Sequence, residues 1–254
     1  MPTRPLDARM RIGGSTYSKE PFPKQVRELR ELGFDYAEMD LTHVTLDSAK
    51  LRELAIELAG SLPLETAHLP PSHFRAADLA RFVGLLDALG PVGTQIFNVH
   101  FLPARAAPAV SAEVRIAWLT DLVRAAEDRG VLVTLENVEE TTTVLRRVLD
   151  ALSDLRFCLD IGHAHLEGRG DGARAYLLAL GDRLSLVHAH DNHRGHGEPG
   201  DEHLPLGKGI NDVERDMREI RRAGYDGRVT LEIFKGTPDD KRASLRKMRR
   251  WSRP

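Results

Sequence analysis

Residues that can bind metal ions or transfer protons recur at the ends of short apolar segments in this 254-residue sequence. Taken singly, each could be a buried polar group that a neighbour satisfies. Six such endings in succession are hard to reach by chance, and these side chains are costly to bury without a partner. Imidazole and carboxylate groups together suit zinc, manganese, cobalt or iron better than calcium. The six residues are His68, His100, Glu136, Asp160, His188 and Glu232.

The segments that carry these residues have the length and apolar character of buried strands. Between them lie longer stretches with apolar residues at helical spacing, such as Val26, Leu29 and Leu32. Asp47 is suited to begin a helix, and Gly33 to end one. We therefore predict eight strands, over Met10–Ser15, Tyr36–Leu41, Leu64–Leu69, Thr94–Phe101, Val131–Asn137, Arg156–Ile161, Leu184–His190 and Arg228–Phe234.

This alternation predicts an α/β fold, a single (β/α)8 TIM barrel over residues 1–254. Closure into a barrel is the simplest way to bury eight parallel strands, and an open doubly wound sheet is the alternative. In a barrel the carboxyl ends of the strands meet at one mouth, where barrel active sites are built. The six strand-end residues would then share one site.

Three further candidate ligands lie in predicted loops: His163, Asp201 and His203. Gly162 would let the chain turn sharply between Asp160 and His163, so that both face the same site. No glycine-rich phosphate loop follows a strand, so no nucleotide cofactor is indicated.

Several motifs resemble the xylose-isomerase-like TIM barrels, a family that unites sugar isomerases and epimerases with AP endonucleases of the endonuclease IV type. The resemblance runs over nearly the whole chain. It is most specific in Leu135-Glu136-Asn137, Leu159-Asp160-Ile161-Gly162-His163, Val187-His188-Ala189-His190-Asp191-Asn192, Asp201-Glu202-His203 with Gly207-Lys208-Gly209, and Leu231-Glu232.

The resemblance implies a core metal site, and it also implies further ligands in one branch of the family. The epimerases share a set that looks like Glu136, Asp160, His188 and Glu232. The trinuclear zinc site of the endonucleases adds residues that look like His68, His100, His163, Asp201 and His203. All of them are present, so the ligand set alone does not separate the two branches.

Other positions bear on the substrate. Arg194 and Asp191 resemble residues that the ketose 3-epimerases carry near their substrate, and Asn192–Gly209 is expected to lie over the barrel mouth. Lys208 could meet a substrate phosphate, although a solvated lysine explains it as well. The endonucleases place an aromatic residue that inserts into DNA after the third-strand histidine, whereas here Leu69-Pro70-Pro71-Ser72 follows His68.

These features favour a metal-dependent sugar or sugar-phosphate isomerase or epimerase. Glu136 and Glu232 would remove and return a proton on opposite faces of the substrate. The expected cofactor is one to three divalent ions, zinc or manganese, with magnesium or cobalt as alternatives. A zinc phosphodiesterase of the AP endonuclease type is the alternative enzyme, and a catalytically silent sugar-binding barrel is a third interpretation.

Composition sets the remaining expectations. The formal net charge of -2 gives no general attraction to nucleic acid or membrane, although a local basic patch would still allow nucleic-acid binding. The one cysteine, Cys158, lies in an apolar stretch and is expected to be a buried, inert thiol. With no apolar leader and no run of about 18 apolar residues, we expect a soluble cytoplasmic protein. Its expected partner is a small carbohydrate, and a homo-oligomer is compatible with the sequence.

Overall fold

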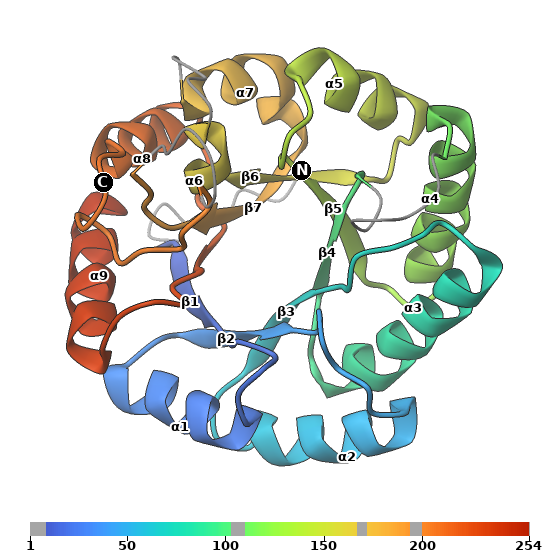
Figure 1. Ribbon diagram of the computed structural model, residues 1–254, viewed down its shortest axis with the longest axis horizontal. Coiled ribbons are helices and arrows are strands. Elements are labelled where there is room, and N and C mark those ends of the chain that lie inside the picture. The colour runs from blue at the N-terminus through green and yellow to red at the C-terminus, as the bar shows by residue number, and fades with distance from the viewer. Residues whose placement is uncertain (1–8, 103–109, 167–171, 194–199, 254) are drawn as a thin grey trace.

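Eight parallel strands close into a barrel, and helices surround it (Figure 1). The structure is a computed structural model that describes residues 9–102, 110–166, 172–193 and 200–253. Each strand pairs with its successor in the chain, and the first strand pairs with the last. The predicted (β/α)8 barrel is therefore confirmed. The strands are β1 (Arg11–Ser15), β2 (Tyr36–Asp40), β3 (Leu64–His68), β4 (Ile96–His100), β5 (Leu132–Glu136), β6 (Arg156–Asp160), β7 (Leu184–Ala189) and β8 (Arg228–Leu231).

All eight predicted strands exist, but each one is shorter than the sequence pattern predicts. At several strands, apolar residues continue in the sequence beyond the last residue that pairs with a neighbouring strand, and the backbone there forms a loop or a helix. Ile161, for example, starts a short helix because the Asp160 carboxylate accepts a hydrogen bond from the backbone N–H of His163 at 2.6 Å. Glu232 likewise lies just beyond β8 and not within it.

Two helix boundaries lie where the sequence suggests. Asp47 caps the second helix by accepting a hydrogen bond from the Lys50 N–H, and Gly33 ends the first helix with φ 88°. The helices are α1 (Phe22–Leu32), α2 (Ser48–Ala59), α3 (Ala76–Leu89), α4 (Ala112–Glu127), α5 (Thr142–Ala151), α6 (Ile161–Ala164), α7 (Ala173–Leu180), α8 (Val213–Arg222) and α9 (Pro238–Trp251), with 3-10 turns η1 (Gly90–Val92) and η3 (Gly181–Arg183).

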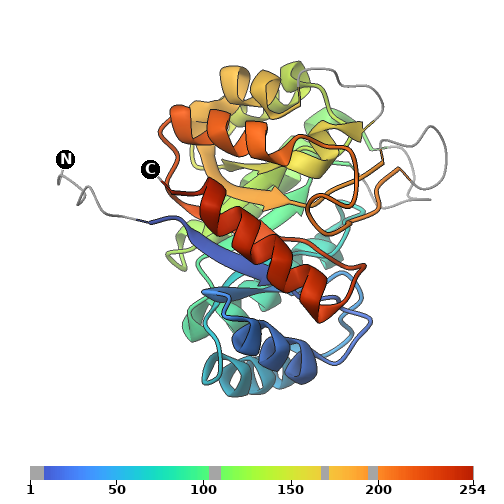
Figure 2. The same cartoon turned by 90° about the vertical axis from the view of Figure 1, so that its left-hand side faces the viewer.

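The main apolar core lies between the barrel wall and the ring of helices. Helix α9 packs across β1 and contacts α1 and α8, so it closes the ring where the chain ends (Figure 2). A separate small apolar cluster consists of Ile96, Cys158 and Leu186. Cys158 is a buried free thiol, as predicted. Among the described residues, no helix has the length and apolar character needed to cross a membrane.

Inside the barrel, polar side chains bond to one another above this apolar cluster. The Tyr36 hydroxyl lies 2.9 Å from Thr230 Oγ1, and Thr66 Oγ1 donates to Glu38 Oε2 at 2.8 Å. Thr134 Oγ1 donates to Asn98 Oδ1 at 2.9 Å. Hydrogen bonds between buried polar groups of this kind offset the cost of removing them from water. These side chains form a polar layer beneath the residues at the mouth.

One glycine of β1 is required by the packing of Tyr36, and this yields a stability prediction. A Cβ on Gly13 would lie 2.2 Å from the fully buried Tyr36 ring. Gly13→Ala should therefore lower the free energy of unfolding by about 1–3 kcal/mol, as overpacking does. Denaturant titration measures the change. Gly181→Ala is the matched control, because Gly181 has φ -61° and open space around its Cβ position. Equal midpoints for the two variants would contradict the packing argument.

Candidate active site

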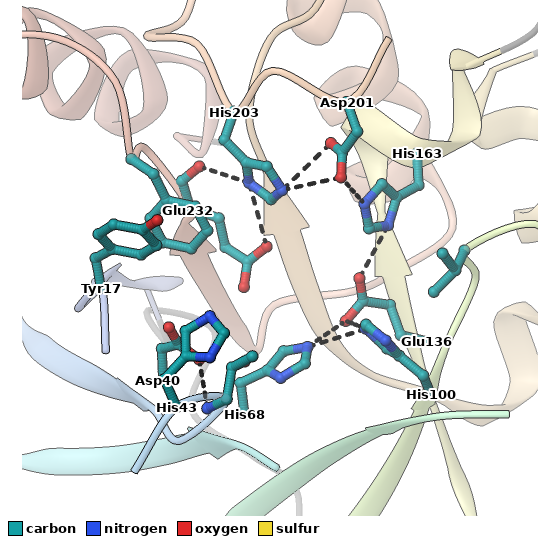
Figure 3. A pocket seen from close by; sticks show the side chains of 13 residues that line it. Tyr17, Asp40, His43, His68, His100, Glu136, His163, Asp201, His203 and Glu232 are labelled. Atoms are coloured by element: carbon teal, nitrogen blue, oxygen red, sulfur yellow. Dashed lines mark hydrogen bonds and ion pairs between the residues drawn. The ribbon is translucent and has the colours of Figure 1, made fainter. Parts of the chain in front are cut away.

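The carboxyl ends of the strands surround a cavity of about 220 Å³ (Figure 3). This is small compared with the ~300–1,000 Å³ of sites for drug-sized ligands, so it favours a small substrate. Glu136 and Glu232 face each other from opposite sides of the cavity. The lining residues are Tyr17, Asp40, Thr42, His43, His68, His100, Glu136, Val138, His163, Asp201, His203, Glu232 and Phe234.

Four of the predicted ligands converge at the mouth, and two of them, Glu136 and Glu232, line the cavity. Glu136, Asp160, His188 and Glu232 are buried, and each offers one donor atom within 4.8 Å of the others. His188 Nδ1 lies 3.2 Å from Glu136 Oε2 and 3.2 Å from Glu232 Oε1. The structure therefore brings together the core set that the sequence predicts, on the ends of β5, β6, β7 and the segment after β8. We name these four residues the core group.

Unpartnered atoms in the core group fit a divalent cation. Glu136 Oε1, Asp160 Oδ2 and His188 Nδ1 are buried without a hydrogen-bond partner among the described residues. Such atoms are rare in folded proteins, because an unpaired buried acceptor is costly. Three carboxylates and one imidazole make a donor set suited to zinc or manganese.

A buried carboxylate on β2, which sequence reasoning missed, orients His188. Glu38 Oε2 lies 3.2 Å from His188 Nε2 and also accepts from Thr66. Because Glu38 engages Nε2, the other ring nitrogen faces the core group. Carboxylate–histidine pairs of this kind commonly set the orientation of a metal-binding imidazole. The signal that could have revealed Glu38 is its position two residues before Asp40, on the same face of the strand.

The two carboxylates that face each other differ in acidity. Burial alone would raise the pKa of Glu136, but the surrounding histidines, His188 first, hold that pKa well below its usual range. Burial raises the pKa of Glu232 well above its usual range. Attraction to His188 lowers this pKa, but repulsion by the carboxylates of Glu136 and Glu38 adds to the effect of burial and outweighs that attraction. In the absence of a cation, burial and mutual repulsion therefore oppose ionisation of all the carboxyl groups at once.

A second group, on β3 and β4, shares Glu136 with the core group. His68 Nε2 lies 3.0 Å from His100 Nε2 and 3.5 Å from Glu136 Oε2, while His100 Nε2 lies 3.7 Å from the same oxygen. The negative charge of Glu136 outweighs the effect of burial and raises the pKa of His68 to about 9. We name His68, His100 and Glu136 the β3–β4 group.

The three predicted loop ligands also meet. His163 Nε2 and His203 Nε2 each lie 3.3 Å from Asp201 Oδ2. His163 comes from α6, directly after β6, and the other two come from the segment after β7. All nine predicted metal ligands therefore lie around one mouth, in three groups that could each hold an ion. Whether they bind metal remains a prediction.

The predicted substrate residues are placed differently. The Asp191 carboxylate is fully buried and accepts backbone hydrogen bonds from Asn192, Gly207 and Gly209, and it does not line the cavity. The Lys208 side chain is 63% exposed, and its ammonium lies 3.5 Å from Asp240. Arg194 lies outside the described residues. The segment Asn192–Gly209 is expected from its sequence to lie over the mouth. Two of its described residues, Asp201 and His203, line the cavity.

Asp160 and His163 do meet as predicted, with His163 Nδ1 3.7 Å from Asp160 Oδ1, but the turn between them does not use the conformational freedom of glycine. Gly162 lies within the short helix α6 and is not among the residues with positive φ. A larger residue is excluded at position 162 for another reason, because its Cβ would lie 2.1 Å from the ring of His190.

Sequence reasoning also missed part of the cavity wall. Asp40 ends β2 in the same way that His68 ends β3, so its place at the mouth follows from a signal that was present. The Tyr17 and Phe234 rings stack with centroids 5.2 Å apart and form an apolar side. His43 also lines the cavity. These three residues lie in loops, where the sequence carries no comparable signal.

Comparisons with known proteins agree with this architecture. The chain matches the family model of the xylose isomerase-like TIM barrel over residues 26–254, so it belongs to that family. It is 27% identical to an uncharacterised protein of Methanocaldococcus jannaschii, covering 89% of this chain and 84% of that one. It is also 27% identical to an L-ribulose 3-epimerase of Methylomonas sp., covering 83% and 78%. A crystal structure of D-psicose 3-epimerase in the presence of D-fructose has a TM-score of 0.78 at 18% identity, covering 96% and 99%.

Metal loading should stabilise the protein measurably. Binding at a hundredfold excess over Kd adds about 2.7 kcal/mol to the native state, which raises the melting temperature by roughly 5–10 °C for a domain of this size. We therefore expect zinc or manganese to raise the Tm of chelator-treated protein in a calorimetric scan. Glu136→Gln should reduce the rise, and Glu53→Gln on the exposed face of α2 should preserve it. An identical Tm with and without metal would show that the groups bind none.

Proposed function

We propose that this protein is a divalent-metal-dependent isomerase or epimerase of a small sugar or sugar phosphate. The observation that carries the proposal is the placement of Glu136 and Glu232 on opposite sides of one small cavity, with His188 between them. Similarity to an L-ribulose 3-epimerase and to the fold of a D-psicose 3-epimerase supports this class of reaction.

Epimerisation inverts a carbon centre, so a proton must leave one face of the substrate and return to the other. Two carboxyl groups on opposite sides of the substrate meet this requirement, one as base and the other as acid. A divalent ion held by the core group would polarise the substrate carbonyl and acidify the neighbouring C–H. Zinc or manganese suits this donor set, and magnesium and cobalt are the alternatives.

The remaining cavity wall suits a polyhydroxylated substrate. The stacked rings of Tyr17 and Phe234 offer an apolar surface to one face of a sugar chain. Asp40 is held by Ser18, whose backbone N–H and hydroxyl donate to its Oδ2 at 2.9 and 2.7 Å. Asp40 and His43 therefore present polar atoms to substrate hydroxyl groups at the side of the cavity formed after β2.

One observation favours a second candidate, a phosphodiesterase of the AP endonuclease type. Glu136 belongs both to the core group and to the β3–β4 group, an arrangement that allows two adjacent ions to act on a phosphoester. Against this candidate, the segment after His68 offers Leu69 and Pro70, both buried, where a residue that inserts into DNA is expected. Exposing a nucleotide costs a few kcal/mol that inserted side chains normally offset.

Loss of either facing carboxylate should abolish proton transfer. With a ketose such as L-ribulose in D2O, Glu136→Gln and Glu232→Gln should each slow deuterium incorporation by roughly 10²–10⁴-fold, the usual contribution of acid–base catalysis. NMR or mass spectrometry measures the incorporation. Glu53→Gln is the control for charge removal at a distant site. Exchange at wild-type rate in both cavity variants would exclude them as the proton-transfer groups.

The two candidate functions differ in their action on DNA. We expect the zinc- or manganese-loaded protein to leave a duplex with one abasic site intact at physiological salt, because it lacks the inserting residue. Gel electrophoresis of the labelled strand detects incision. Efficient incision that disappears in Glu136→Gln would make the phosphodiesterase the function of this site.

A further inference from the structure

One buried histidine at the barrel mouth has no hydrogen-bond partner among the described residues and no role in the reaction proposed above. His190 directly follows β7 and is fully buried. Neither of its ring nitrogens has a hydrogen-bond partner among the described residues. Nε2 lies 3.1 Å from Asp160 Oδ1 and 3.9 Å from Asp201 Oδ1. A buried imidazole without a hydrogen bond, facing two carboxylates, indicates a position for a cation.

The His190 ring occupies the space that a side chain at position 162 would need, and residue 162 is a glycine. The three atoms nearest to a Cβ on Gly162 all belong to the His190 ring, at 2.1 to 2.4 Å. Real Cβ contacts are never this short, so residue 162 must be glycine while His190 keeps its place. The close approach sets His190 against α6, the helix that carries His163.

The neighbouring histidines present a lone pair to the same point. His163 Nδ1 lies 3.1 Å from the backbone oxygen of Asn137, and His203 Nδ1 lies 3.1 Å from that of Glu232. A carbonyl oxygen can only accept a hydrogen bond, so each Nδ1 carries the hydrogen in the neutral ring. The two Nε2 atoms then face Asp201, which also has only acceptor atoms.

The distances suit one tetrahedral ion. Ligand atoms about 2.0–2.1 Å from a zinc-type ion lie about 3.3 Å from one another. The two distances from Asp201 Oδ2 to His163 Nε2 and His203 Nε2 are both 3.3 Å. His190 Nε2 lies 3.9 Å from Asp201 Oδ1, so a small rotation of the carboxylate or the ring brings it into the same shell. The four donors lie within 4.8 Å of one another.

We infer that His190 completes a closed, four-ligand metal site with His163, Asp201 and His203, and that the ion in it is structural. Three imidazoles and one carboxylate would fill all four tetrahedral positions. Four protein ligands around one ion are characteristic of structural zinc sites, and they leave no open position for water or a phosphate oxygen. This ion does not take part in the chemistry of the core group, and the inference holds whichever reaction the core group performs.

Such an ion would hold the cavity wall in place. Asp201 and His203 lie far along the segment after β7, whereas His163 lies in α6 and His190 directly follows β7. The His203 ring stacks on His190 at 3.9 Å and on Phe234 at 4.6 Å between centroids, and Phe234 stacks on Tyr17. His203 has φ 50°, a strained value for a residue other than glycine, which surrounding contacts must maintain. The ion therefore connects the loop to the barrel and positions the apolar wall of the cavity.

The test is a metal count on the whole protein, independent of activity. Chelator-treated protein is reloaded with zinc, passed through a desalting column and analysed for bound metal by mass spectrometry. We expect His190→Asn to lose one equivalent relative to wild type, or to bind that ion 10–100-fold more weakly. The matched control is His193→Asn, since His193 is three residues further on, its side chain is 57% exposed and it pairs with Glu202. This control should keep the full count.

Two further variants assign the lost ion to its site. His203→Asn and the double variant His190→Asn/His203→Asn should both lack the same single equivalent, because the two histidines bind one ion. Glu232→Gln should lose the core ion and retain this one. With cobalt in place of zinc, the tetrahedral absorption should weaken in His190→Asn and persist in Glu232→Gln. His190→Ala, with circular dichroism to verify folding, repeats the count without an amide at this position.

Three results would overturn the inference. His190→Asn could keep the wild-type metal count and cobalt spectrum, which would show that His190 is not a ligand. The double variant could lose two equivalents, which would place His190 and His203 on different ions. His190→Asn and Glu232→Gln could lose the same ion, which would assign His190 to the core group. Absence of sugar exchange in the wild type would reject the proposed function and leave this count unchanged, so the two failures are distinguishable.

Discussion

The charge of one buried carboxylate, Glu136, links four of the histidines at the barrel mouth. It lies at the end of β5 with no exposure to solvent, and histidines from four elements, β3, β4, α6 and β7, reach it. His163 Nδ1, His188 Nδ1 and His100 Nε2 lie 3.0, 3.2 and 3.7 Å from its oxygens. A carboxylate at this depth is stable only when positive charge surrounds it. The positions of the histidines are therefore linked, since each depends on the same negative charge.

The barrel keeps this polar centre separate from the apolar core by the alternation of its strands. On β4, Phe97 and Val99 belong to the core shared with the helices, while Asn98 between them bonds to Glu136 and to Thr134. Successive side chains of a strand point to opposite faces, so one short segment serves both purposes. Stability comes from the outer face and chemistry from the inner one. A substitution on one face can therefore leave the other largely intact.

The segment after β7 obtains its shape from a carboxylate. Asp191 accepts backbone hydrogen bonds from Gly207, Gly209 and Asn211 at 2.8 to 3.0 Å, and its own backbone pairs with Leu204. For these described backbone groups, the bonds take the place of regular strand pairing and hold them close to the barrel. A residue that resembles a substrate contact thus acts here on the loop, and the loop delivers Asp201 to the cavity.

The sequence alone determined the order of the elements and the placement of nine candidate ligands, because strand and helix periods and the residue at a strand end are local properties. Only the tertiary structure decided which side chains meet. Glu38 and His188 are 150 residues apart and touch only because the barrel closes. Gly162 and His190 likewise meet where β6 and β7 pair, and the register of that pair shifts after Phe157. Closure and stagger arise from the packing of the whole barrel, so no local pattern in the chain encodes these contacts.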